Sequence, residues 1–387
     1  MPELSNRTET FTDSVIRRMT RISDEYNAVN LSQGFPDFFP PREILDRLCE
    51  VTNEDFHQYA ITWGAQNFRE ALAGKIKHFS GLDADPNAEL VVTCGSTEAM
   101  MAAMMSVTNP SDKVIVFSPF YENYGADTIL SGAEPIYVPL VPPAFKFDPE
   151  VLENAFRQKP KAIIVCNPSN PCGKVFTKEE LTVIADLAKK YDAFVITDEV
   201  YEHILYAPNV HTYMAALPGM KERTITCNSL SKTYSITGWR LGYTFANPEI
   251  SERIKKVHDF LTVGAAAPLQ EAAVTGLKFG DDYYRDLQAK YTEKRNLFLH
   301  GLDDLKIAHT VPEGAYYILI DISEFGYESD LEFAEILAEK VGVGAVPGSS
   351  FFKEPENRYV RLHFAKKNET LNEALNRLAD MREKLKK

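Results

Sequence analysis

The sequence lacks the features that would place the protein in a membrane or in an oxidising compartment. No apolar run approaches the roughly 18 residues that a membrane span needs. The N-terminal stretch MPELSNRTETFTDSV has no apolar core of the kind found in signal peptides. The five cysteines are scattered and form no CxxC pair, which argues against a disulfide framework and a zinc site. We therefore expect a cytoplasmic protein that does not contact membranes.

The chain also lacks a cluster of positive charge. Its 42 lysines and arginines are outnumbered by 55 aspartates and glutamates, and the formal net charge of −13 would repel a phosphate backbone. The only basic run, REKLKK at the C-terminus, ends a helix-like stretch, where cations suit the helix dipole. The eight histidines show neither HxxxH nor HExxH spacing. We expect no nucleic-acid partner and no bound metal.

What the sequence does contain is a series of short apolar runs between residues 89 and 247. They read ELVVTCG, KVIVFSP, EPIYVPL, KAIIVCN, AFVITDE, TITCNSL and LGYTFAN. Their hydrophobicity is nearly continuous, which is typical of strands that are covered on both faces. Helix-like stretches separate them; TKEELTVIADLAKKY, for example, begins with a capping box and carries one apolar stripe. The pattern predicts an α/β protein with a mainly parallel, seven-stranded sheet between helices.

The pattern changes after about residue 285. A charged helix-like segment is followed by a strand (AYYILIDI), a helix (DLEFAEILAEKVG), the strands VGAVPGS and RYVRLHFA, and a final helix. Such a mixture is typical of a smaller α+β domain. The N-terminal 45 or so residues contain no comparable strand series, and we assign them to the same unit. The prediction is a large domain of residues 46–285 and a discontinuous small domain of residues 1–45 and 286–387.

Chemically active residues gather directly after the apolar runs, where the ligand crevice of an open parallel sheet lies. Gly95, Ser96 and Thr97 follow VVTC and open a helix, so that free backbone amides there would bind a phosphate. Arg240 could add a bidentate contact to the same anion. Lys232, which follows TITC, could form a Schiff base with an aldehyde, particularly if its surroundings depress its pKa.

Asp198 ends the apolar run FVIT, and burying it would be costly unless it met a cation or a protonated ring nitrogen. A phosphorylated pyridine aldehyde would satisfy the carboxylate, the amine and the anion-binding residues at once.

Nine motifs carry a resemblance to a known family, and they occur in sequence order. They are SQGFPDF, YAITWG, GSTEA, SPFYENY, NPSNPCG, DEVY, SLSKTYSITGWRLG, PEGAYY, and VPGSSF followed by YVRLHFA. By these motifs the chain resembles, over nearly its whole length, the class I and II aminotransferases of pyridoxal-5′-phosphate fold type I. The resemblance implies an enzyme of amino-acid metabolism, a homodimeric transaminase that moves an amino group from an L-amino acid to a 2-oxo acid in a ping-pong cycle.

The resemblance also implies a role for individual residues. Lys232 would form the Schiff base and move the proton between Cα and the cofactor's C4′, and Asp198 would keep the pyridine nitrogen protonated. The implied cofactor-binding set is Gly95, Ser96, Thr97, Tyr121 stacked on the ring, Asn170 and Tyr201 on its phenolic oxygen, Asp198, Ser229, Ser231, Lys232, Arg240, and Tyr59 reaching the phosphate from a second subunit. Arg361 would bind the substrate's α-carboxylate, helped by Gly34 and Asn170.

The motifs say less about the substrate. NLSQGFPDF is similar to the kynurenine, glutamine and methionine branch of the family, so we expect an aromatic or sulfur amino acid as donor and 2-oxoglutarate as acceptor. Thr97 stands where some aspartate-specific relatives place a lysine, and Cys172 stands where the family's NPTG usually has Thr. Two alternatives stay open: a C–S β-lyase on the same fold, and a non-catalytic regulator that binds pyridoxal phosphate.

Overall fold

The computed structural model describes residue 9 and residues 14–385. The start of the expected small domain (residues 1–8 and 10–13) and the end of the run REKLKK (residues 386–387) lie outside the described residues. In the described part of the chain, none of the helices combines the length and the apolar character of a membrane span.

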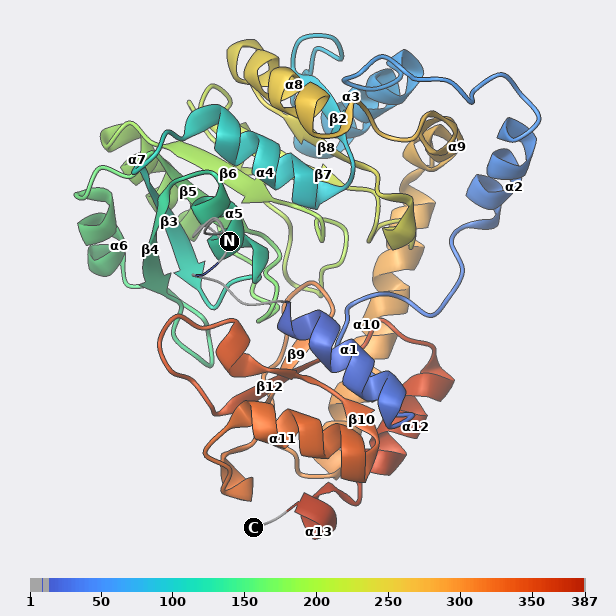
Figure 1. Cartoon of the computed structure of the whole chain (residues 1–387), viewed down its shortest axis with the longest axis vertical. Coiled ribbons are helices and arrows are strands. Elements are labelled where there is room, and N and C mark those ends of the chain that lie inside the picture. The colour runs from blue at the N-terminus through green and yellow to red at the C-terminus, as the bar shows by residue number, and fades with distance from the viewer. Residues whose placement is uncertain (1–8, 10–13, 386–387) are drawn as a thin grey trace, which may run out of the picture.

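Helices and short strands alternate along most of the chain (Figure 1). The helices are α1 (Val15–Glu25), α2 (Arg42–Val51), α3 (Gln66–Ser80), α4 (Ser96–Val107), α5 (Asn123–Leu130), α6 (Pro149–Phe156), α7 (Lys178–Lys190), α8 (Pro248–Thr262), α9 (Ala267–Leu277), α10 (Asp281–Asp304), α11 (Asp330–Ile336), α12 (Asn368–Leu378) and α13 (Met381–Leu385). The strands are β1 (Val29–Asn30), β2 (Leu90–Thr93), β3 (Lys113–Ser118), β4 (Glu134–Pro139), β5 (Ala162–Cys166), β6 (Phe194–Asp198), β7 (Thr224–Ser229), β8 (Gly242–Phe245), β9 (Tyr317–Asp321), β10 (Val343–Gly344), β11 (Val346–Pro347) and β12 (Tyr359–His363).

Strands β2 to β8 form one seven-stranded sheet in the order β2-β8-β7-β6-β5-β3-β4. Neighbouring strands in the part β7-β6-β5-β3-β4 pair in parallel, and β8 runs antiparallel to both β2 and β7. Each of the apolar runs quoted above corresponds to one of these strands, so the predicted mainly parallel α/β architecture is confirmed. The direction of β8 was not predicted.

Side chains of the sheet alternate between two cores, one on each face. Ile163 and Val195 pack with α6 and α7 in one core, whereas Ile164 and Ile196 pack with α4 and α8 in the other. Figure 1 shows α4 lying across the front of the sheet. Helices therefore cover both faces, which explains why the strands are apolar along their whole length.

A second group of elements lies below this sheet in Figure 1. Strands β9, β11 and β12 form an antiparallel sheet in the order β11-β12-β9, and β1 pairs in parallel with β10. Helix α1 packs against β10 and β11, although it lies at the other end of the sequence. The expected domain boundaries after residues 45 and 285 fall inside α2 and α10, and the division into two domains stays a prediction.

The carboxyl end of the seven-stranded sheet faces this second group. Gly314 N donates to Gly173 O (2.9 Å) in the loop after β5, and Ala315 N donates to Ile204 O (2.9 Å) in the loop after β6. These bonds close one side of the crevice that open parallel sheets form beyond their strands. The fold therefore places residues after β5, β6 and β7 next to residues of β9 and β12.

Phe298 tests the core around β9 and β12, because its ring is fully buried among apolar side chains of that core. We expect Phe298→Ala to lower the free energy of unfolding by about 3–5 kcal/mol, since the cavity cannot refill completely. Val311→Ala is the control: its side chain is 63% exposed, and a change within about 0.5 kcal/mol is expected. Urea unfolding of both variants measures the difference, and equal destabilisation would contradict the described packing.

Candidate active site

Lys232 lies in the turn that follows β7, and its amine points into the crevice. Nζ donates to Gly34 O (3.1 Å) and lies 5.8 Å from the centroid of the Tyr201 ring and 5.7 Å from that of Tyr316. Burial lowers the pKa of Lys232 to about 8, and the nearby Arg240 acts in the same direction. Compared with a solvated lysine, more of this amine is therefore neutral near pH 7, as a nucleophile requires.

Asp198 is the last residue of β6 and is buried. Tyr124 OH donates to its Oδ2 (2.7 Å), and Val200 N donates to its Oδ1 (3.3 Å). Burial raises the pKa of Asp198, while these hydrogen bonds and the charge of Lys232 act against that shift. A buried carboxylate held in this way would be stabilised by a cation at its open side, and a protonated ring nitrogen is such a cation.

Arg361 lies in β12 with its side chain fully buried. Nη1 donates to Asn170 Oδ1 (2.7 Å), and Nη2 donates to Ser32 O (2.8 Å). The guanidinium carbon lies 4.4 Å from the centroid of the Tyr317 ring and 4.6 Å from that of Phe351. These contacts hold the planar fork in one orientation, which suits bidentate binding of a carboxylate.

Four residues form what we call the anion cradle: Gly95, Ser96, Thr97 and Arg240. Gly95 precedes α4 with φ +85°, and a Cβ atom there would clash with the guanidinium of Arg240. A Cβ on Gly242 would clash with the backbone of Gly95. Glycine at both positions thus lets the arginine approach the amino end of α4, where backbone amides and a cation together favour an anion.

Ser229 and Ser231 reach the same edge of the sheet through strand pairing. Ser229 is opposite Gly242 in the β7–β8 ladder, and Gly242 is opposite Thr93 in the β2–β8 ladder. Leu230 N also donates to Leu241 O (3.1 Å), so the chain leaving β7 stays beside the chain entering β8. Both serines are buried at the edge where the anion cradle lies.

Two tyrosines that the sequence analysis assigned no role complete the surroundings of Lys232. Tyr316 OH donates to Gly34 O (2.8 Å), the same oxygen that accepts from Lys232. Tyr317 OH and Tyr201 OH share a hydrogen bond of 2.8 Å. The motif PEGAYY contained both residues, and adjacent tyrosines at the start of a strand were the signal that could have indicated them.

Two of the expected cofactor-binding residues, Tyr121 and Tyr59, lie in different surroundings. Tyr121 makes an edge-on ring contact with Tyr124 (5.8 Å between centroids), and the pKa of Tyr121 is raised by burial, with Asp198 close enough to contribute. Tyr124 was quoted in SPFYENY but was not among the expected site residues.

Tyr59 lies on the loop between α2 and α3 with 89% of its surface exposed. A single chain does not bring Tyr59 together with the other residues.

The residues present fit pyridoxal 5′-phosphate. The glycine-lined anion cradle suits a phosphate, the amine of Lys232 with its lowered pKa suits an aldehyde, and the buried carboxylate of Asp198 suits a protonated pyridine nitrogen. They come from the strand ends of β2, β6 and β7 and from the segment before β8.

Comparisons with known proteins identify the family of this chain. Residues 26–378 match the sequence pattern of the family described as Aminotransferase class I and II. The chain is 34% identical over 369 residues to a methionine aminotransferase of Escherichia coli, covering 95% of this chain and 96% of that protein. It is 33% identical over 402 residues to kynurenine–oxoglutarate transaminase 3 of Bos taurus, covering 96% of this chain and 88% of that protein.

A solved structure agrees equally well. The N-succinyldiaminopimelate aminotransferase of Mycobacterium tuberculosis superposes with a TM-score of 0.94 at 34% identity, over 98% of this chain and 99% of that chain. The chain therefore belongs to the class I and II aminotransferase family and is an amino-acid aminotransferase of the methionine and kynurenine branch that uses pyridoxal 5′-phosphate.

Proposed function

We propose that this aminotransferase takes its amino group from an aromatic or sulfur-containing L-amino acid and passes it to 2-oxoglutarate. The observation that carries the proposal is the half-buried Lys232, whose amine has its pKa lowered to about 8 and lies beside the rings of Tyr201 and Tyr316. The substrate class is supported by the names of two relatives, a methionine aminotransferase and a kynurenine–oxoglutarate transaminase.

In the proposed mechanism, pyridoxal 5′-phosphate supplies an aldehyde that condenses with amines and a protonated pyridine that accepts electrons. Lys232 Nζ would take the proton from the substrate's Cα and return a proton at C4′, and its lowered pKa leaves more of the amine neutral, as a base requires. Asp198 would hold the positive charge at the ring nitrogen. Asn170 and Tyr201 would donate to the phenolic oxygen.

Arg361 orients the substrate in this mechanism. Its guanidinium, held by Asn170 and Ser32, binds the α-carboxylate and thereby keeps the Cα–H bond within reach of Lys232. Gly34 lies beside this carboxylate site. The cycle is ping-pong: the donor leaves as its 2-oxo acid before the acceptor binds, so that Arg361 serves both carboxylates in turn.

The anion cradle, with Ser229 and Ser231, holds the phosphate in this proposal. Tyr121 stacks on the ring, which its position next to Tyr124 and near Asp198 supports. Catalysis is proposed to occur in the cytoplasm.

We propose that the working unit is a homodimer in which Tyr59 reaches the phosphate of the other subunit. Tyr59 and Phe260 are 89% and 91% exposed, and Ile61 and Leu261 are also exposed. The two segments are adjacent, because His258 in α8 hydrogen-bonds through Nε2 to Thr62 O (2.8 Å). Exposed apolar side chains that lie together in this way are typical of a surface that another protein chain covers.

Donor profiling tests the proposed function. With pyridoxal 5′-phosphate bound, we expect the protein to form glutamate from 2-oxoglutarate faster with L-methionine or L-kynurenine than with L-aspartate. Lys232→Ala is expected to lower this rate by about 10³-fold or more and to remove the imine absorbance band, because the base and the imine nitrogen are lost. Glutamate production and the absorbance spectrum are the measurements.

Lys221→Ala serves as the control, since Lys221 pairs with Glu89 (2.9 Å) away from the crevice. Pyruvate and thiol release from cystathionine without glutamate formation would show a β-lyase instead. Normal turnover by Lys232→Ala would refute the assignment of Lys232.

Arg361→Lys tests carboxylate binding. A lysine cannot make the bidentate contact, so we expect KM for both the amino acid and the oxo acid to rise roughly ten- to hundredfold. Arg358→Lys is the matched control in the same strand region, because Arg358 is exposed and pairs with Asp321 (2.6 Å). Steady-state kinetics would count against the role of Arg361 if the two variants had the same KM values.

Mixing the Tyr59→Ala and Lys232→Ala variants tests whether Tyr59 acts across subunits. Tyr59→Ala alone should weaken cofactor affinity roughly ten- to hundredfold, because a hydrogen bond to a charged phosphate is lost. In a dimer of one Tyr59→Ala chain and one Lys232→Ala chain, one of the two sites contains both native residues. About half of the dimers in a random mixture are such hybrids, so about a quarter of all sites should be restored. Cofactor titration of the mixture measures this. No restoration, or a fully active 43.6 kDa particle in light scattering, would contradict the proposal.

A further inference from the structure

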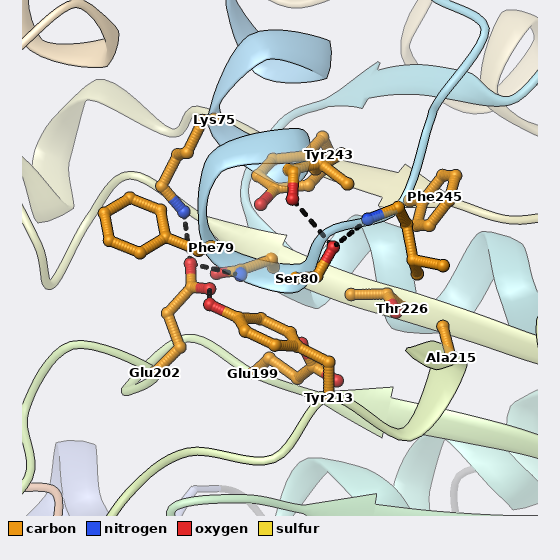
Figure 2. Close-up of a pocket in the computed structure, with 13 residues that line it drawn as sticks. Lys75, Phe79, Ser80, Glu199, Glu202, Tyr213, Ala215, Thr226, Tyr243 and Phe245 are labelled. Atoms are coloured by element: carbon orange, nitrogen blue, oxygen red, sulfur yellow. Dashed lines mark hydrogen bonds and ion pairs between the residues drawn. The ribbon is translucent and has the colours of Figure 1, made fainter. Parts of the chain in front are cut away.

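A buried ion pair lies behind the site and takes no direct part in the mechanism above. Glu202 directly follows Tyr201 in the turn after β6, and its carboxylate Oε1 meets the ammonium of Lys75 from α3. The two side chains are only 3% and 6% exposed. Figure 2 shows them pointing toward each other beside Phe79 and Tyr213.

The carboxylate of Glu202 also accepts two further hydrogen bonds, which fix its orientation. Asn228 Nδ2 donates to Oε1 (2.7 Å), and Tyr213 OH donates to Oε2 (2.7 Å). Burial alone would raise the pKa of Glu202, but the charge of Lys75 and its hydrogen bond hold that pKa well below its usual range. Glu202 is therefore an anion with each oxygen hydrogen-bonded.

Asn228 connects the Glu202 carboxylate to the end of β7 through hydrogen bonds. While its Nδ2 donates to Glu202, its Oδ1 accepts from the backbone N of Ser229 (2.7 Å). Both ends of the amide are thus engaged, and the amide cannot rotate without losing a buried hydrogen bond. Ser229 is the residue at which β7 ends, opposite Gly242 and next to the anion cradle.

We propose that Glu202 is a positioning residue for the phosphate end of the cofactor site: paired with Lys75, it orients Asn228 and thereby holds the backbone at Ser229 in place. The inference rests on the proposed function, because it assumes that the anion cradle and Ser229 bind the phosphate. It goes beyond that function by adding three residues from outside the crevice, Lys75, Asn228 and Glu202.

A second buried pair gives a matched comparison. Lys174 Nζ lies 2.9 Å from Glu180 Oε1, and the Lys174 side chain is as well buried as that of Lys75. Glu180 takes part in the capping box of α7, so this pair supports a helix and not a strand end of the site. Lys174→Met therefore reproduces the loss of a buried lysine charge without the link to Asn228.

Variants at Glu202 should remain folded. A small cavity of about 20 Å³, lined in part by Glu202, Asn228 and Tyr213, adjoins the carboxylate and is large enough for one water molecule. Water can enter such a polar space and solvate Lys75 after the side chain is shortened. Glu202→Gln keeps the shape of the side chain and an oxygen for Asn228 while removing only the charge.

The test compares pyridoxal 5′-phosphate with pyridoxal, which lacks the phosphate, by absorbance titration of the imine in the full-length protein. For Glu202→Ala we expect affinity for pyridoxal 5′-phosphate to fall roughly tenfold or more and affinity for pyridoxal to change by less than about threefold. Glu202→Gln should show a smaller loss of the same kind, and Lys75→Met combined with Glu202→Gln should recover part of it, because no unpaired charge remains.

Two reference variants serve as the positive and the negative control. Arg240→Ala should lower the preference for the phosphorylated form, and Lys174→Met should leave the preference unchanged. Equal losses for both ligands in the Glu202 variants, or an unchanged preference, would overturn the inference while leaving the proposed function intact. If Arg240→Ala does not alter the preference, the anion cradle is wrong, and this inference fails with it.

Discussion

Parallel pairing of β5, β6 and β7 determines where the chemistry of this protein lies. Cys166 is level with Asp198, and Asp198 is level with Cys227, so β5 and β6 end together and β7 continues only to Ser229. The segments that follow these strands contain Asn170, Tyr201 and Lys232 and therefore meet at one edge of the sheet. A change of register between any two of these strands would separate an amide, a phenol and an amine that are distant in the sequence.

Burial gives the site its electrostatic character. The same loss of water lowers the pKa of Lys232 and raises the pKa of Asp198, so both groups are shifted toward their neutral forms. A bound group that carries an anion near Arg240 and a cation near Asp198 offsets these shifts with opposite charges. The site is thus electrostatically complementary to a zwitterionic ring compound.

The strands and most of the candidate site could be predicted from the sequence because both depend on local patterns. Buried strands are apolar along their length, and candidate site residues such as Asp198 and Lys232 lie at their ends or in the turns after them. The direction of β8 could not be predicted, since an apolar run carries no sign of its orientation. Tyr316 and Tyr317 were missed for a different reason: Tyr316 approaches Lys232 and Tyr317 contacts Tyr201 from another part of the fold, through contacts that no local pattern records. The link between Lys75 and Glu202 is also long-range.

The reversal at β8 has a consequence for the loop that joins it to β7. Because the two strands are antiparallel neighbours, the chain leaves and re-enters the sheet at the same edge, with Ser229 and Gly242 directly opposite each other. Lys232 and Arg240 both belong to this loop. The amine of Lys232 and the guanidinium of Arg240 consequently share a single support, so that a small sliding of the β7–β8 pair against the other strands would carry both groups together and preserve the spacing between them.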